Sequence, residues 1–159
     1  MLKSKWIFFL VFFSQFLFSN TIEKAYKALY VFDYFKSKQF FYNSYKANKV
    51  NASFGLATIF YRTDNPFSNI DSAAKYIAIS KSNFKDTISF DSYHINTNTI
   101  NKLAIDVAQK GYIKYCTDLN VDNLNYYLSK FFFANDILIE SCVVKRDQIV
   151  LGNYAAFQR

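Results

Sequence analysis

The stretch "DYFKSKQFFYNSYK" runs from Asp33 to Lys46 and holds six aromatic residues and three lysines in fourteen positions. Lysines interspersed with aromatic rings are typical of two different structures. On a nucleic-acid-binding surface the rings stack on bases while the lysines contact phosphates. In a packed helix the rings lie inside and the lysines lie in water. The positions of the two residue types around a helix distinguish these structures.

Helical spacing separates the rings from the lysines. At about 100° per residue, one stripe of a predicted helix over residues 33–48 consists of Tyr34, Ser37, Phe41, Ser44 and Tyr45. The side chains that point away from this stripe are Lys36, Gln39, Asn43 and Lys46. Lys38 lies at its edge, where its methylenes can cover apolar neighbours while its charge reaches water. The stretch therefore predicts a packed helix.

Small residues recur in the predicted helices at a fixed spacing. A small residue lets a neighbouring helix approach closely, and a large residue between two small ones fills the space beside the contact. The spacing small-x3-large-x2-small occurs twice, at Ser37, Phe41 and Ser44 and again at Ala73, Ile77 and Ser80. The copies are offset by 36 residues (73 − 37). Between them lies a predicted helix over residues 51–62, whose packing face is Leu56, Ala57 and Phe60.

Residues 22–80 resemble tetratricopeptide repeats, which are helix–turn–helix units of 34 residues. The small-large-small spacing matches the A-x3-F-x2-A of the family's second helix, and residues 51–62 match the L-G-x2-Y of its first helix. Lys49 stands where the family has a closing proline, and the turn over residues 62–71 is longer than usual, as a degenerate or Sel1-like repeat tolerates. We expect Asp71 to cap the next helix. The resemblance implies an all-α, right-handed α-solenoid of helical hairpins.

The resemblance also implies a binding site. In tetratricopeptide arrays the first helix of each unit lines a groove that takes an extended peptide or a partner's helix. The matching positions in this chain are Tyr26, Tyr30, Asn51, Phe54, Thr58, Tyr61 and Arg62. Tyrosine and arginine suit an interface because they combine contact area with a polar group. The alternative is that these residues only cover the solvent side of the helices.

The first residues have the pattern of a secretory signal peptide. Lys3 and Lys5 precede an apolar run that is too short for a membrane span, and cleavage is expected after Ser19. An uncleaved anchor is the alternative. The predicted parts are a signal peptide (1–19), tetratricopeptide-like repeats (20–81), a connecting segment (82–96) and further helical hairpins (97–159). We expect an exported protein, periplasmic or outer-membrane associated, whose mature chain has no membrane span.

Two features of the exported chain concern covalent chemistry. Cys116 and Cys142 are 26 residues apart. They either form a disulfide across a helical hairpin, which export permits, or pack unpaired in a core. Thr87 and Ser72 lie in D-[ST]-aliphatic tripeptides, which resemble the O-glycosylation sequon of exported Bacteroidetes proteins. The last helix has no following helix to pack against, so we expect either a truncated chain or an end that docks on another protein.

The sequence favours binding over catalysis. His94 is the only histidine, three glycines leave little for a phosphate-binding loop, and no hydrolase or zinc-protease motif occurs. We therefore expect no enzyme activity, no metal and no cofactor. The leading hypothesis is a protein–protein interaction scaffold of the Bacteroidetes cell envelope, with a protein partner and no nucleic acid. The alternative is a secreted polyanion- or nucleic-acid-binding helical protein that uses the lysines and tyrosines.

Overall fold

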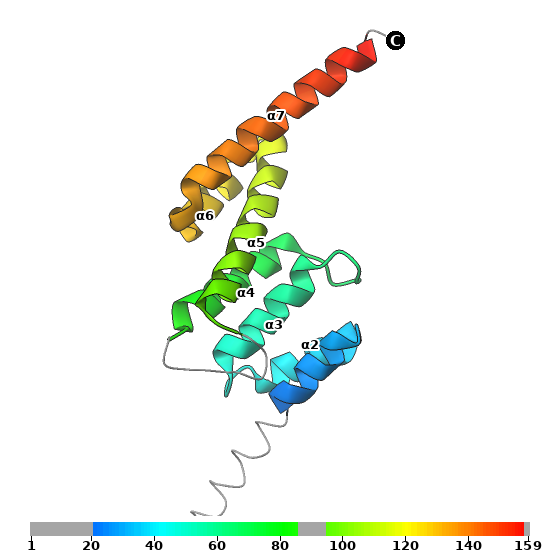
Figure 1. Ribbon diagram of the computed structural model, residues 1–159, viewed down its shortest axis with the longest axis vertical. Helices are drawn as coiled ribbons and strands as arrows, with labels where there is room; N and C mark the ends of the chain where they lie inside the picture. The colour runs from blue at the N-terminus through cyan, green and yellow to red at the C-terminus, as the bar shows by residue number, and fades with distance from the viewer. Residues whose placement is uncertain (1–20, 86–94, 158–159) are drawn as a thin grey trace, which may run out of the picture. The chain divides into compact units, whose positions relative to one another are not determined.

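A computed structural model describes residues 21–85 and 95–157, with side chains to residue 149 (Figure 1). In these ranges the regular elements are helices and no β-strand occurs, so the predicted all-α class is confirmed. The predicted signal peptide, residues 1–19, and most of the predicted connecting segment lie outside the described residues. None of the described helices combines the length and the apolar character that crossing a membrane requires.

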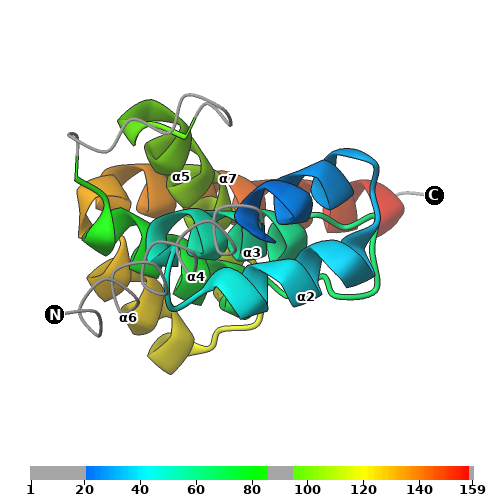
Figure 2. The ribbon, with the colours of Figure 1, turned by 90° about the horizontal axis from the view of Figure 1, so that it is seen from below.

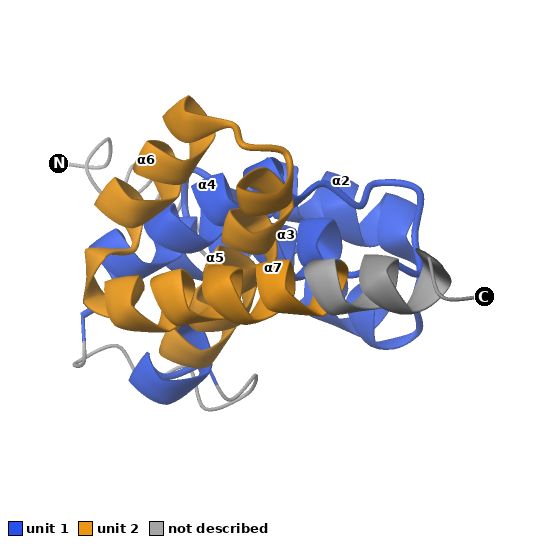
Figure 3. Cartoon of the chain, turned by 90° about the horizontal axis from the view of Figure 1, so that it is seen from above, with its two compact units in different colours: residues 1–100 blue, residues 101–159 orange. Residues whose placement is uncertain are grey.

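The chain divides into two compact units, residues 1–100 and residues 101–159 (Figure 3). The helices of the first unit are a helix over residues 21–30, α2 (Tyr34–Ser44), α3 (Lys49–Tyr61) and α4 (Ile70–Asn83). The chain continues through α5 (Thr97–Thr117), whose first residues belong to the first unit, α6 (Val121–Lys130), the 3-10 helix η2 (Phe132–Ala134) and α7 (Asn135–Phe157). In the first unit α3 packs against both α2 and α4 (Figure 2).

The buried face of α2 is the stripe that the sequence predicts. Its buried residues are Tyr34, Ser37, Phe41 and Ser44, whereas Lys36, Gln39, Asn43 and Lys46 are exposed. The hydroxyl of Ser37 donates to the backbone oxygen of Ala25 at 3.0 Å, which joins α2 to the helix over residues 21–30. The hydroxyl of Ser80 similarly joins α4 to α3, because it donates to the backbone oxygen of Val50 at 3.1 Å. The two serines thus satisfy their polar groups while allowing close packing.

Gly55 brings α2 and α3 into close contact. A Cβ atom at this position would overlap the ring of Phe41, which is fully buried. The helix α3 is buried on several sides, and its buried residues are Asn51, Ala52, Ser53, Gly55, Leu56, Ala57, Ile59 and Phe60. A central helix needs small side chains wherever a neighbouring ring crosses it, and glycine is the smallest.

The helix caps correct one expectation. Asp33 caps α2, because its side chain accepts a hydrogen bond from the backbone N–H of Lys36 at 3.1 Å. The predicted cap of α4, Asp71, is wrong by two residues. Asn69 is the cap, and its side chain accepts from the backbone N–H of Ser72 at 2.8 Å. Asp71 instead lies in the first turn of α4, where a carboxylate interacts favourably with the helix dipole.

The second unit repeats the contact between a glycine and an aromatic ring. A Cβ atom at Gly111 in α5 would overlap the ring of Tyr127 in α6, which is fully buried. Cys116 in α5 and Cys142 in α7 are joined by a disulfide, with their Cα atoms 5.9 Å apart. The sequence leaves open whether these two cysteines are bonded or unpaired, and in the structure they are bonded. Beyond the disulfide, residues 143–149 of α7 are exposed.

Candidate functional site: an exposed aromatic end

Large apolar side chains are exposed where the helix over residues 21–30 turns into α2. Tyr30 is 85% exposed, Val31 67%, Phe32 58% and Phe35 68%. We call these four residues the aromatic end. Single exposed apolar side chains are ordinary on protein surfaces, but a contiguous group marks a site of interaction.

The backbone of the turn directs these side chains outward. The N–H of Asp33 donates to the carbonyl of Ala28 at 2.9 Å, and the N–H of Phe32 donates to the carbonyl of Leu29 at 3.1 Å. These bonds close the end of the helix and leave Phe32 in the left-handed region, at φ 61°. Glycine usually occupies this position, and a residue with a side chain costs roughly 1–2 kcal/mol there. The turn therefore holds an aromatic ring at a conformational cost.

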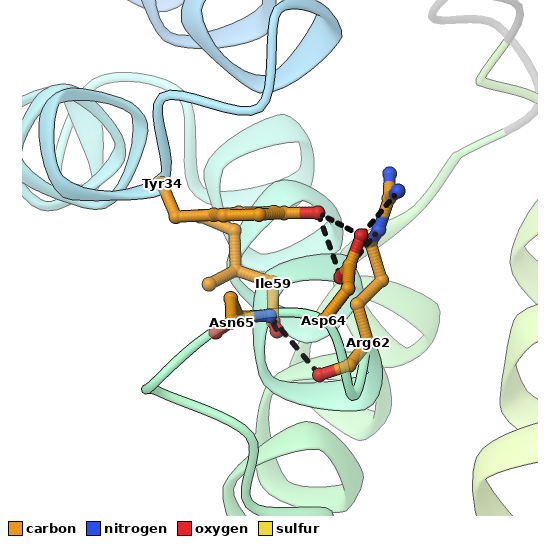
Figure 4. A network of polar contacts seen from close by, with 5 residues as sticks. All are labelled: Tyr34, Ile59, Arg62, Asp64 and Asn65. Carbon is orange, nitrogen blue, oxygen red and sulfur yellow. Dashed lines mark hydrogen bonds and ion pairs between the residues drawn. The ribbon is translucent and has the colours of Figure 1, made fainter.

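Figure 4 shows a network of polar contacts that includes Tyr34, Arg62 and Asp64. The hydroxyl of Tyr34 lies 2.8 Å from each carboxylate oxygen of Asp64. Arg62 donates to the same two oxygens, from Nε at 3.2 Å and from a terminal nitrogen at 3.0 Å. The guanidinium carbon of Arg62 lies 4.7 Å from the centre of the Phe32 ring and 5.5 Å from that of Tyr34. Arginine over an aromatic face is an attractive cation–π arrangement.

The loop that carries Arg62 and Asp64 is itself held by a side chain. The amide of Asn65 donates to the backbone oxygens of Ile59 and Arg62, at 2.9 and 3.0 Å (Figure 4). Its oxygen accepts from the backbone N–H of Phe67 at 2.8 Å. The long turn after α3 is therefore an ordered loop, and it positions the network against the start of α2.

A second cation–ring contact lies next to Phe35. The rings of Phe35 and Phe67 meet edge to face, with centres 4.8 Å apart. The ammonium of Lys38 lies 3.8 Å from the centre of the Phe67 ring. Since Phe67 follows the loop that Asn65 holds, α2 and this loop together fix both Phe32 and Phe35. A surface whose rings are already fixed loses less conformational entropy when it binds.

At neutral pH the groups of the network have the protonation states that its hydrogen bonds require. Hydrogen bonds from Arg62 and Tyr34 lower the pKa of Asp64 below its ordinary value of 3.8. Burial and the hydrogen bond to Asp64 raise the pKa of Tyr34 above its ordinary value of 10.0. Asp64 is therefore charged and Tyr34 is neutral throughout the physiological range, which is the state that the geometry requires.

The predicted groove residues lie in different environments. Tyr30 is 85% exposed, and Arg62 lies in the network with Asp64 and Tyr34. The hydroxyl of Tyr26 donates to the backbone oxygen of Asn51 at 2.7 Å. Asn51 is 1% exposed and so presents no surface to a partner. The other predicted groove residues are partly buried along α3: Phe54, Thr58 and Tyr61.

Of the remaining predicted sites, Thr87 lies outside the described residues, and Ser72 is partly buried in the first turn of α4. Among the described residues no group of three or more histidine, cysteine or acidic side chains is placed to hold a metal ion.

Sequence reasoning missed Val31, Phe32 and Phe35 as surface residues. The signal that points to Val31 and Phe32 is their position directly before Asp33. An aspartate that caps a helix must follow a turn, so a bulky run directly before it lies in that turn. Apolar residues in a turn have no helix face on which to be buried, so this position would have predicted the exposure of these two residues. Phe35 lies in α2, and the same signal does not apply to it.

Comparisons with known proteins give no further assignment. No model of a protein family matches the chain, and neither the curated proteins nor the solved structures contain a match.

Proposed function

We propose that the protein is a non-enzymatic protein-binding scaffold and that it binds its partner through the aromatic end. The observation that carries this proposal is Phe32, an exposed ring in the left-handed region that Arg62 holds in place. The contact with Arg62 offsets part of the conformational cost, but the ring itself stays 58% exposed and so adds little to the core. Strained residues that the surrounding structure holds in place are typical of binding sites.

The proposal extends to architecture and location. The close contacts of α2, α3 and α4, with small residues at the helix contacts, support tetratricopeptide-like hairpins that continue as a right-handed solenoid. The signal-peptide pattern of residues 1–19 supports export to the periplasm or the outer membrane. The disulfide between Cys116 and Cys142 supports an oxidising compartment.

Photo-crosslinking in cells that make the protein tests the binding site. A photoreactive phenylalanine analogue replaces Tyr30, which is 85% exposed, and crosslinked partners are identified by mass spectrometry. We expect crosslinks to an envelope protein that fall at least about tenfold when Phe32→Gly is added, a loss of about 1.4 kcal/mol or more. Glycine relieves the backbone strain, so the fold keeps or gains stability.

Leu119→Gly is the matched control. Leu119 also lies in the left-handed region, at φ 53°, is 68% exposed and directly precedes a helix cap, Asn120. Both substitutions relieve the same kind of strain, but only Phe32→Gly removes the ring of the aromatic end. Equal crosslinking by the two variants would reject the site. Crosslinks to nucleic acid that depend on Lys36 instead of Phe32 would support the polyanion-binding alternative.

A further inference from the structure

We propose that the segment of the partner that covers the aromatic end is acidic: an apolar side chain packs on the rings, and carboxylates bind Arg62 and Lys38. This inference rests on the proposed function and adds the chemistry of the partner. Three observations support it: the pairing of the charges around the site, the positions of the two cations, and the carboxylates that the site itself contains.

The acidic side chains near the aromatic end are each paired with a cation. Glu23 pairs with Lys27 at 2.8 Å, Asp33 with Lys36 at 2.9 Å, and Asp64 with Arg62 at 3.0 Å. Lys38 has no carboxylate partner among the described residues. Its ammonium contacts ring faces only, 3.8 Å from the centre of Phe67 and 5.9 Å from that of Phe60. Lys38 is therefore a positive charge beside the site that no carboxylate of the described residues neutralises.

Arg62 also has hydrogen-bonding capacity for a partner. Its guanidinium uses Nε and one terminal nitrogen to bind Asp64. Asp64 does not occupy the other terminal nitrogen, and the side chain is 34% exposed. Because a guanidinium presents five N–H groups in a fixed plane, Arg62 can bind Asp64 and a partner's carboxylate together.

The two cations lie beside the exposed rings. Arg62 covers Phe32, and Lys38 covers Phe67, which contacts Phe35. A segment that buries the rings of Phe32 and Phe35 therefore comes within reach of both cations. Covering them with an apolar segment would desolvate the charges, and a basic segment would be repelled, at a cost of several kcal/mol. An apolar anchor covers the rings, and acidic groups next to it compensate the charges of Arg62 and Lys38.

The carboxylates at this end favour a peptide over a polyanionic surface. The side chains of Asp33 and Asp64 are 32% and 49% exposed. An anionic membrane or a nucleic acid presents many phosphates at once and would bring some of them near these carboxylates. A peptide can place one or two carboxylates at Arg62 and Lys38 and none at the aspartates.

Peptide selection tests this chemistry. A random displayed peptide library is selected against the wild-type protein and depleted against the Phe32→Gly variant, which leaves peptides that need the aromatic end. We expect the recovered sequences to combine aspartate or glutamate with leucine or an aromatic residue. Replacing their acidic residues by the corresponding amides should weaken binding by at least about tenfold, the effect of one charge-assisted hydrogen bond.

Variants of Lys38 provide an independent measurement, because Lys38 lies outside the Arg62–Asp64 network. Lys38→Gln should weaken the binding of the recovered peptides by about three- to tenfold. Lys38→Arg should bind them like the wild type, and Leu119→Gly should leave their binding unchanged. Recovered peptides that are neutral or basic, or that bind equally well as amides, would overturn this inference and leave the proposed function standing. If no peptide distinguishes wild type from Phe32→Gly, the proposed function fails. Phe32-dependent binding to phosphatidylserine vesicles in place of peptides would overturn both.

Discussion

At the scale of single residues, contacts between a glycine and an aromatic ring decide how closely the helices approach. Gly55 contacts Phe41 in the first unit, and Gly111 contacts Tyr127 in the second. Both rings are fully buried. Since interiors are packed at crystal-like density, neither ring has room to move away from an added methyl group.

Gly55→Ala is therefore expected to lower the free energy of unfolding by about 1–3 kcal/mol through overpacking. The better helix propensity of alanine offsets part of this loss, by about 1 kcal/mol. Urea unfolding followed by circular dichroism measures the change. In a Phe41→Leu background the same substitution should cost clearly less, because the ring is absent. A cost that is equal in both backgrounds would show that the Phe41 ring is not the obstacle.

Asn51 is a residue whose structural environment is unfavourable. It is 1% exposed, and among the described residues neither its amide nitrogen nor its side-chain oxygen has a hydrogen-bond partner. Asn51→Leu should raise the free energy of unfolding by about 1–2 kcal/mol, because an unsatisfied buried amide is costly. Asn43→Leu, on the exposed face of α2, is the control and should change it by less than about 0.5 kcal/mol. A large loss of stability with Asn51→Leu would mean that the amide has a bound partner.

At the scale of helices, Tyr76 connects α4 to both α2 and α3. Its ring stacks on Phe60 with centres 5.6 Å apart, and its hydroxyl lies 3.3 Å from that of Tyr42. Burial, followed by the hydrogen bond to Tyr42, raises the pKa of Tyr76 from 10.0 to about 12. The stability that follows from this shift is fully present below pH 10.0 and is lost as the pH rises toward 12.

Tyr76→Phe tests this linkage. The difference in the free energy of unfolding between wild type and this variant should stay constant up to about pH 10 and then decrease, because the unfolded tyrosine ionises first. Urea unfolding at a series of alkaline pH values measures the difference, and tyrosinate absorbance counts the ionised side chains. A difference that is unchanged above pH 10 would contradict the raised pKa.

The disulfide is the covalent link between α5 and α7. It closes a loop with a sequence separation of 26 residues, and the chain-entropy model assigns such a loop about 3 kcal/mol of stability. We expect reduction, or the double substitution Cys116→Ser/Cys142→Ser, to lower the free energy of unfolding by about this amount. Thiol titration of the unfolded protein provides the check, and two free thiols without reductant would refute the bond.

At the scale of the whole molecule, the positive charge is distributed instead of concentrated. The net charge is +7, and near the aromatic end Lys27 and Lys36 are paired with Glu23 and Asp33. We expect only non-specific binding to duplex DNA, with a Kd of about 10⁻⁶ M or weaker at physiological salt. Fluorescence anisotropy with a labelled duplex measures it. Binding tighter than about 10⁻⁸ M, in the range of specific complexes, would favour the polyanion-binding alternative.

Most of the correct predictions about the fold rest on helical periodicity. The stripe of α2 that contains Ser37 and Phe41 is buried as expected, and the segments expected to be helical are helices, with boundaries shifted by a few residues. Hydrophobic patterns predict such features because burial acts on every turn of a helix. The Asp64–Tyr34 contact could not be predicted in this way, because it joins residues 30 positions apart through the conformation of one loop. The exposure of Phe32 was missed because it follows from the turn before Asp33, which helical periodicity does not describe.

The placement of the glycines predicts where the chain will tolerate mutation. Neither glycine with described contacts has a positive φ, and the left-handed positions among the described residues are occupied by Phe32 and Leu119. In most proteins glycines in turns resist substitution and helix interiors accept alanine. In this protein we expect the opposite when saturation mutagenesis is scored by folding. Almost no substitution is tolerated at Gly55 or Gly111, whereas the turn positions Phe32 and Leu119 tolerate many. If Phe32 stays invariant when the screen is scored by function, the ring is maintained by selection for binding and not for stability.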